Sequence, residues 1–113
     1  NKTIYKSKNI VFDAPAHHYD IIVDIPNDFE SIAENDNCIQ SIYSARKKIF
    51  CTQYHSELGY DYIANLMVFW KKNYSKIINE LDFDALINSL KIKEVNDNEN
   101  RLIELKNWLK LLN

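Results

Sequence analysis

The chain has 113 residues, with one glycine, two prolines, a formal net charge of −2 and 46% hydrophobic residues. This length suits one compact domain and is too short for two. A single glycine excludes nucleotide-binding loops of the G-x-G-x-x-G or G-x-x-x-x-G-K type, which need several glycines for tight turns and close backbone approach. Fourteen basic against sixteen acidic residues do not create the cationic field typical of nucleic-acid binding, so no nucleic-acid partner is expected.

Membrane insertion and a disulfide framework are not expected either. The longest apolar runs, such as residues 66–70, are far shorter than the ~20 residues of a membrane span. Cys38 and Cys51 each lie in an apolar, strand-like stretch, which favours buried thiols in a reducing compartment and predicts a soluble, cytoplasmic protein. The sequence begins at Asn1 without Met or a signal-peptide pattern, so we expect a piece of a longer protein.

The first half of the chain predicts strands. Apolar residues there come in short runs separated by turns rich in Pro, Asn and Asp, which is typical of a mostly antiparallel sheet. The expected strands are residues 10–12, 21–23, 38–43 and 49–51.

After Gly59 the apolar spacing becomes helical, at i, i+3, i+4 and i+7, and predicts three amphipathic helices. Their stripes are Ile63, Leu66, Met67, Trp70 and Tyr74; then Phe83, Leu86, Ile87 and Leu90; then Leu102, Leu105, Leu109 and Leu112. The helical aromatic residues are expected in the core, namely Phe69, Trp70, Tyr74 and Trp108.

The ends of these helices are also predicted from the sequence. Asp82 is the expected N-cap of the second helix. The polar residues 93–100 are expected to form a loop, in which Asn96 and Glu99 make a capping box ahead of the third helix.

His55 is the first candidate for chemistry because histidine titrates near neutral pH without help. If the preceding strand continues, His55 and Glu57 project from the same face, two residues apart. A carboxylate there holds the imidazole in one tautomer, as the third member of a catalytic triad does. The other interpretation is a surface histidine beside a surface glutamate.

The candidate nucleophiles are unconvincing. Cys51 precedes His55 by four residues, which is roughly 13 Å along a strand and beyond hydrogen-bond reach. Cys38 has no nearby glycine to form a strained elbow, and its apolar surroundings suit a buried thiol.

His17 and His18 form the second cluster, with Tyr19 and Asp20. Adjacent histidines suggest a metal, but no further ligands stand at a recognisable spacing, so neither a metal nor another cofactor is expected.

Several of these segments, in this order, resemble the C-terminal half of a class I (triad) glutamine amidotransferase domain. The matching segments are His18-Tyr19-Asp20, Ile25-Pro26-Asn27-Asp28-Phe29, Ile32-Ala33, Ile39-Gln40-Ser41-Ile42 and Phe50-Cys51-Thr52-Gln53-Tyr54-His55-Ser56-Glu57. In that family an H-x-D element and an L-P-x-G-F-like turn lead through two strands to the signature G-V-Q-F-H-P-E. The residues after Glu57 resemble the branch related to the glutaminase domain of GMP synthase, which inserts helices before a closing helix, here residues 101–109. The resemblance covers nearly the whole chain, 1–113, as one half of a single domain.

This sequence departs from the family pattern at several positions. Ser56 replaces proline, Tyr54 replaces phenylalanine, and Asn27-Asp28 replace the glycine of the turn. The G-x-C-x-G elbow with the nucleophile is absent, so the resemblance implies that an N-terminal half carrying it lies outside this chain.

For the complete domain, the resemblance implies a three-layer α/β sandwich that hydrolyses glutamine through a Cys-His-Glu triad. A thiolate from the other half attacks the carboxamide, His55 transfers the proton to the leaving ammonia, and Glu57 orients His55. His18, Tyr19 and Asp20 match the element near the glutamine pocket. The implied partners are glutamine, the N-terminal half and an ammonia-accepting synthase. Two alternatives remain: a non-catalytic amidotransferase-like binding or regulatory module, and an unrelated α/β interaction domain.

Overall fold

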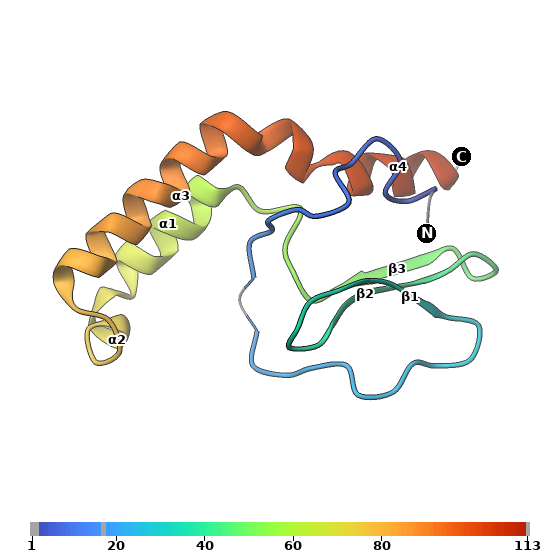
Figure 1. Ribbon diagram of the computed structural model, residues 1–113, viewed down its shortest axis with the longest axis horizontal. Coiled ribbons are helices and arrows are strands. Elements are labelled where there is room, and N and C mark those ends of the chain that lie inside the picture. The colour runs from blue at the N-terminus through green and yellow to red at the C-terminus, as the bar shows by residue number, and fades with distance from the viewer. Residues whose placement is uncertain (1–2, 17, 113) are drawn as a thin grey trace. The chain divides into compact units, whose positions relative to one another are not determined.

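The computed structural model describes residues 3–16 and 18–112 as a small mixed α/β chain with a three-stranded antiparallel sheet and helices (Figure 1). The chain divides into two compact units. Unit 1 consists of the residues up to Glu57 together with those from Leu102 onward, and unit 2 consists of Leu58–Arg101.

The sheet of unit 1 contains β1 (Glu30–Glu34), β2 (Ile39–Ser44) and β3 (Ile49–Thr52) in that order. Both pairings are antiparallel, and the register between β1 and β2 is interrupted by bulges, whereas β2 and β3 pair regularly. The turn between β1 and β2 is held by Asn35, whose side-chain oxygen accepts hydrogen bonds from the backbone N–H groups of Asn37 and Cys38, both at 3.0 Å.

Two of the four predicted strands are wrong and one strand was missed. Residues 10–12 form no strand, and residues 21–23 contribute only an isolated bridge between Ile22 and Ile39. A run of three apolar residues is a weak strand signal, because packing against neighbouring strands decides strand formation more than intrinsic propensity does, and Ile10 and Val11 are exposed. β1 was missed because its glutamates at both ends hide the alternation of a half-buried strand.

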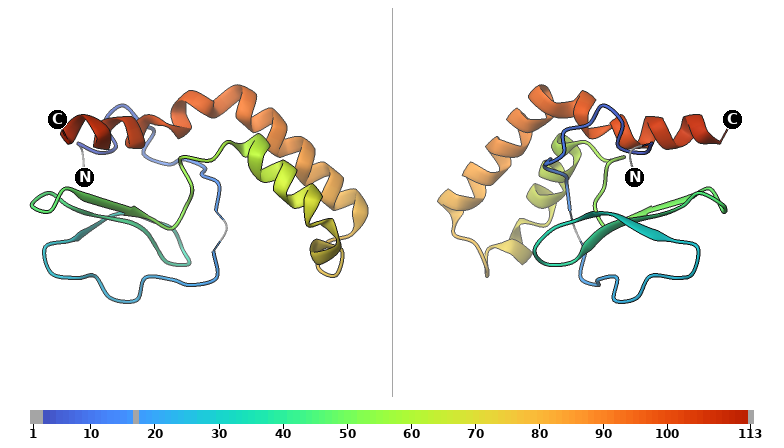
Figure 2. Two further views of the ribbon diagram at one scale, coloured as in Figure 1. Left: turned by 180° about the vertical axis from the view of Figure 1, so that it is seen from behind. Right: turned by 45° about the vertical axis from the view of Figure 1, so that its right-hand side comes forward.

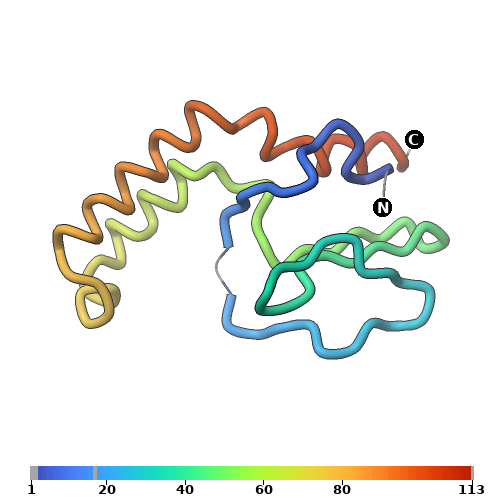
Figure 3. The backbone as a smooth tube through the Cα atoms, viewed as in Figure 1, coloured from blue at the N-terminus to red at the C-terminus, as the bar shows by residue number. Residues whose placement is uncertain are grey.

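Helix α4 (Ile103–Leu111) belongs to unit 1 and lies beside the N-terminal turn (Figure 3). The Asn107 side chain donates hydrogen bonds to the backbone oxygens of Ile4 and Lys6, at 2.8 and 2.9 Å. Trp108 Nε1 donates to the Lys48 carbonyl at 3.3 Å, at the turn between β2 and β3. These side-chain contacts attach the end of the chain to its beginning and to the sheet.

Unit 2 is helical and contains α1 (Tyr60–Phe69), the short α2 (Lys71–Tyr74) and α3 (Glu80–Arg101), with α1 and α3 side by side in all views (Figures 1 and 2). Its buried core is small and consists of Ala64, Phe83 and Ile87, against which Met67, Tyr74, Ile78 and Leu90 pack.

Helix α3 begins earlier and ends later than the sequence predicts. Asn79, not Asp82, caps it: the Asn79 side-chain oxygen accepts from the Asp82 N–H, and the Asn79 amide donates to the Asp82 carboxylate, both at 2.9 Å. Residues 93–100 are helical, because Glu94 accepts from the Tyr60 N–H at 2.8 Å and from the Arg101 guanidinium at 3.1 Å, which fixes this polar stretch against α1. The predicted capping box of Asn96 and Glu99 is therefore wrong, and α4 starts without a side-chain cap.

The aromatic residues of the helices divide into two groups. Tyr74 packs against the core of unit 2, as predicted. Phe69 and Trp70 are exposed, so their predicted burial is wrong, and Trp108 is half-buried. None of the helices in the described residues combines the length and the apolar character needed to cross a membrane.

Left-handed backbone occurs at Ser7, Asp28 and Lys48, with φ of 69°, 73° and 57°. The one glycine, Gly59, has an ordinary φ of −66° at the start of α1. The turns of this chain are thus built without glycine.

Candidate functional site

The side chains of His55 and Glu57 are in contact. The distance between His55 Nδ1 and a carboxylate oxygen of Glu57 is 2.7 Å, which confirms the expected contact. The expected strand geometry is wrong, since β3 ends at Thr52 and residues 56–57 form a turn. A turn of the backbone, not strand alternation, brings the two side chains together.

The backbone around His55 is held by a segment distant in the sequence. The His55 N–H donates to the Pro15 carbonyl at 2.7 Å, and Tyr54 forms an isolated antiparallel bridge with Ala16. On the other side, Ser56 is buried. The position of the imidazole is thus set by residues 15–16 as well as by its own turn.

The contact with Glu57 also defines the chemistry that His55 can perform. An ionised carboxylate only accepts hydrogen bonds, so the proton of this hydrogen bond belongs to His55 Nδ1. In the neutral ring, Nε2 is then the unprotonated, basic nitrogen. The described part of the chain offers Nε2 no hydrogen-bond partner, and the His55 side chain is 36% exposed. The pair therefore has the form of a general base with an orienting acid.

The His18-Tyr19-Asp20 element lies next to the segment that carries His55. Gln53 donates through its side-chain amide to the Asp20 carbonyl at 3.4 Å. The same carbonyl accepts a 2.8 Å hydrogen bond from His18 Nδ1, while the Tyr19 side chain is exposed. Two segments that the resemblance connects in function are therefore neighbours, through backbone and Gln53 contacts.

Neither cysteine is paired with a base among the described residues. Both are free and half-buried. The Cys38 sulfur accepts a hydrogen bond from Gln40 at 3.1 Å, and Cys51 lies within β3. The sequence predicts buried thiols, whereas both are only partly buried.

A metal site also finds no support in residues 3–16 and 18–112, where no three His, Cys, Asp or Glu side chains are grouped to hold an ion. His17, one of the two adjacent histidines, lies outside the described residues.

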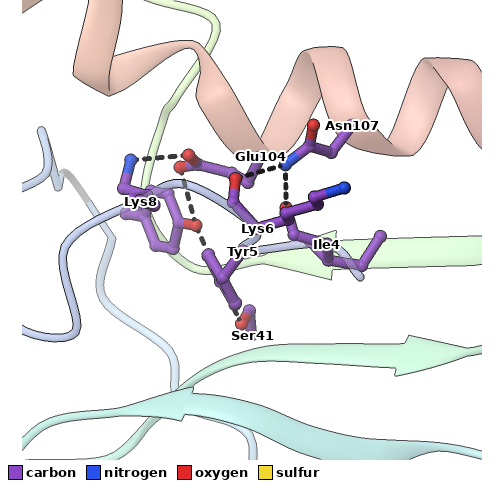
Figure 4. Close-up of polar contacts among 8 residues, drawn as sticks. Ile4, Tyr5, Lys6, Lys8, Ser41, Glu104 and Asn107 are labelled. Carbon is purple, nitrogen blue, oxygen red and sulfur yellow. Dashed lines mark hydrogen bonds and ion pairs between the residues drawn. The ribbon is translucent and has the colours of Figure 1, made fainter. Parts of the chain in front are cut away.

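A buried polar network around Glu104 of α4 was not predicted (Figure 4). Glu104 is fully buried, and its carboxylate accepts from Lys8 Nζ at 2.5 Å and from the Tyr54 hydroxyl at 3.0 Å. Tyr5 extends the network with hydroxyl contacts to Ser41 at 2.7 Å and to Tyr54 at 2.9 Å. The residue preceding His55 is thus anchored to α4.

Burial raises the pKa of both network tyrosines above the ordinary value, and contacts with the neighbouring acidic groups add to the effect at Tyr54. These hydroxyls therefore stay protonated at neutral pH. Their function in the fold is to donate and accept hydrogen bonds, not to transfer charge.

An open pocket of about 910 Å³ lies beside this network in unit 1. Its walls include Lys8, Phe12, Ala33, Gln40 and Tyr54, whereas His55 and Glu57 do not line it. His55 therefore follows a residue of the pocket wall, Tyr54, but neither His55 nor Glu57 lines the pocket.

Comparison of the chain with protein-family models, with curated proteins and with solved structures finds no match in any of the three.

Proposed function

We propose that this chain supplies the histidine and the glutamate of a class I glutamine amidotransferase or glutamine hydrolase. The observation that carries the proposal is the 2.7 Å contact between His55 Nδ1 and Glu57. It gives the imidazole the tautomer that a general base needs, with the proton on Nδ1 and Nε2 as the basic nitrogen.

The proposed reaction needs a cysteine that neither Cys38 nor Cys51 provides. A thiolate supplied from outside residues 1–113 attacks the glutamine carboxamide, and His55 delivers a proton to the nitrogen as the carbon–nitrogen bond breaks. Ammonia leaves, and water then cleaves the thioester with His55 as the base. Glu57 stabilises the imidazolium that forms in each step.

The arrangement of the motifs supports the same proposal. The Asp20 carbonyl and the Gln53 amide bring the His18-Tyr19-Asp20 element next to the histidine motif, where an element of a substrate pocket is needed. Which of its side chains contacts glutamine is not assigned.

In the complete domain, the antiparallel sheet described above would form one edge of a three-layer α/β sandwich, and the other half would add the remaining strands. An ammonia-accepting synthase would be the natural partner. The two free thiols favour a reducing compartment, which we take to be the cytoplasm.

The test is a glutaminase assay of the protein as its gene encodes it, with His55→Ala as the main variant. We expect kcat to fall by about 10²–10⁴-fold, the usual contribution of a general acid or base. Glu57→Gln should lower kcat to a smaller extent, with little change in KM, because an amide keeps the shape and loses the charge that stabilises the imidazolium.

Glu99→Gln is the matched control, because Glu99 is an exposed glutamate of α3 and is distant from His55 in the sequence. This variant should leave the activity unchanged. Full activity in His55→Ala would overturn the proposed role. Absence of activity in the wild-type protein, together with an upstream sequence that has no G-x-C-x-G elbow, would favour a non-catalytic amidotransferase-like module.

A further inference from the structure

Tyr54, the residue before His55, is held at both of its ends. It is 3% exposed, and its hydroxyl donates to the buried carboxylate of Glu104 at 3.0 Å. Its backbone carbonyl accepts a 2.7 Å hydrogen bond from the Thr52 hydroxyl. A buried residue that is bonded at the tip of its side chain and in its main chain has little freedom to turn. Tyr54 is therefore a fixed point directly ahead of the candidate base.

The peptide group between Tyr54 and His55 is held on both sides. Its carbonyl accepts from Thr52, and its N–H donates to the Pro15 carbonyl at 2.7 Å. Because a peptide group is planar, these two hydrogen bonds fix its plane and limit the directions in which the His55 side chain can leave the backbone. The 2.7 Å contact with Glu57 depends on that direction, since a hydrogen bond weakens steeply when its partners are displaced.

The hydrogen bonds around Glu104 run in one direction (Figure 4). The carboxylate, which is paired with Lys8, only accepts, so the Tyr54 hydroxyl donates its one proton there. The Tyr5 hydroxyl must then donate to Tyr54, and the Ser41 hydroxyl must donate to Tyr5. Loss of the Tyr5 hydroxyl would leave the bond from Tyr54 to Glu104 in place, whereas loss of the Tyr54 hydroxyl removes it.

We propose that Tyr54 is a positioning residue for His55, and that Glu104 of α4 acts on the imidazole through it. The network holds the Tyr54 ring, Thr52 holds the following peptide group, and this peptide group directs the imidazole toward Glu57. Helix α4 thus belongs to the candidate site, although Glu104 is 50 residues from Tyr54 in the sequence. The catalytic consequence rests on the proposed function, whereas the orientation of His55 is measurable without any activity.

The first test measures the tautomer of His55 by nitrogen NMR of the protein as its gene encodes it, with labelled histidine. At about pH 8 an ordinary histidine is neutral. The signals of His55 are identified by their loss in His55→Ala. In the wild type we expect the proton on Nδ1. In Tyr54→Phe, which keeps the ring and removes the bond to Glu104, the shifts of the two ring nitrogens should move toward each other as both come to share the proton.

Tyr5→Phe is the matched control, because it removes a hydroxyl from the same network and leaves the bond from Tyr54 to Glu104 in place. Urea unfolding should show that both variants lose stability, whereas only Tyr54→Phe should change the His55 signals. An unchanged tautomer in Tyr54→Phe, or an equal change in both variants, would overturn the proposal, since the network would then act on stability alone.

Thr52→Val gives a second measurement that does not depend on how well Tyr54→Phe folds. Valine has nearly the shape of threonine and suits a strand, but it cannot donate to the Tyr54 carbonyl. The His55 shifts should move in the same direction as in Tyr54→Phe. Unchanged signals in Thr52→Val would show that the peptide group does not transmit the constraint, and would contradict the proposal.

The catalytic consequence is measured in the glutaminase assay. Tyr54→Phe should lower kcat by up to about 10²-fold, the loss that a small misplacement of a catalytic group can cause. KM should change little, as expected of a residue that positions the base without binding glutamine. Tyr5→Phe should retain the wild-type kcat. An inactive wild type would contradict the proposed function, while the tautomer would still decide the role of Tyr54. A normal kcat for Tyr54→Phe in an active enzyme would overturn that role.

Discussion

Glu104 places a buried carboxylate at the centre of a polar network in unit 1. It is fully buried, and its two oxygens are occupied by Lys8 and by the Tyr54 hydroxyl. Lys8 also lies over the Phe12 ring, with its nitrogen 4.3 Å from the centroid. A buried charge is tolerated only when paired and hydrogen-bonded, and both conditions are met here.

Glu104→Ala is therefore expected to lower the free energy of unfolding by about 3–5 kcal/mol, the usual loss when one partner of a buried ion pair is removed. Glu104→Gln should cost less, because an amide oxygen still accepts one hydrogen bond. Urea unfolding of the protein as its gene encodes it measures both values. Glu99→Ala, at an exposed position of α3, is the control and should stay within about 0.5 kcal/mol of the wild type. Equal losses for Glu104→Ala and Glu99→Ala would contradict this account of the network.

The same network predicts a loss of stability in alkaline solution. The pKa of Tyr5 and of Tyr54 is raised by burial, so above the unfolded tyrosine pKa of about 10 the folded state retains protons that the unfolded state releases. Stability is unaffected by these groups below that pH and falls as the pH rises from about 10 toward the folded values. Unfolding followed by the ultraviolet absorbance of tyrosinate should show this fall, with a shallower slope in Tyr54→Phe. An unchanged slope in that variant would exclude Tyr54 as a cause.

At the scale of the elements, the start of α3 shows how the choice between two nearby capping residues can be mistaken when it is made from the sequence. The sequence contains Asn79 and Asp82, both good caps, and spacing alone chooses the residue nearest the apolar stripe. In the fold the two side chains bond reciprocally, so the helix begins three residues earlier.

Asn79→Ala is expected to destabilise the protein by about 1 kcal/mol, the typical cost of losing a helix N-cap. Because the cap closes the first turn of α3, amide hydrogen exchange should accelerate there before it does in the rest of the helix. Asn88→Ala, in the exposed middle of α3, is the matched control and should not destabilise, since alanine is the better helix former. Equal destabilisation by the two variants would argue against the cap.

The parts of the fold that local pattern specifies are those the sequence predicts. The strands predicted at 38–43 and 49–51 are confirmed as β2 and β3, and the stripe of Phe83 and Ile87 is confirmed as buried, because short apolar runs and helical spacing are local signals. The contact of His55 with Glu57 could also be predicted, because the two residues are only two positions apart in the sequence. Its catalytic role stays a prediction.

The features that could not be predicted depend on partners far away in the sequence. Glu104 reads as the solvated side of an amphipathic helix, yet its partners are 50 and 96 residues away. The helical residues 93–100 lack an apolar stripe, and the contact of Glu94 with the start of α1 stabilises them instead. No property of the isolated segments carries this information.

At the scale of the whole molecule, the described residues leave much apolar surface uncovered. Ile10, Val11 and Val23 of unit 1 are exposed, in segments that the sequence predicted as strands. Apolar runs without partners favour association with other chains.

Residues 1–113 expressed by themselves are accordingly expected to aggregate or to remain partly unfolded. Light scattering and the binding of a hydrophobic dye measure this directly. A cooperative thermal transition of a monomer, without dye binding, would count strongly against the half-domain interpretation.

The left-handed residues of the turns have a consequence for how this chain tolerates change. Ser7, Asp28 and Lys48 each have a positive φ that glycine adopts without steric cost, whereas a side chain there costs about 1–2 kcal/mol. The Lys48 carbonyl also holds Trp108, so the strain at this turn is opposed by a contact from α4. This strain comes from the backbone conformation of each residue and not from its side-chain contacts. At Ser7 and Lys48 a change to glycine would therefore relieve backbone strain, whereas at Asp28 it would also remove the ion pair with Arg46.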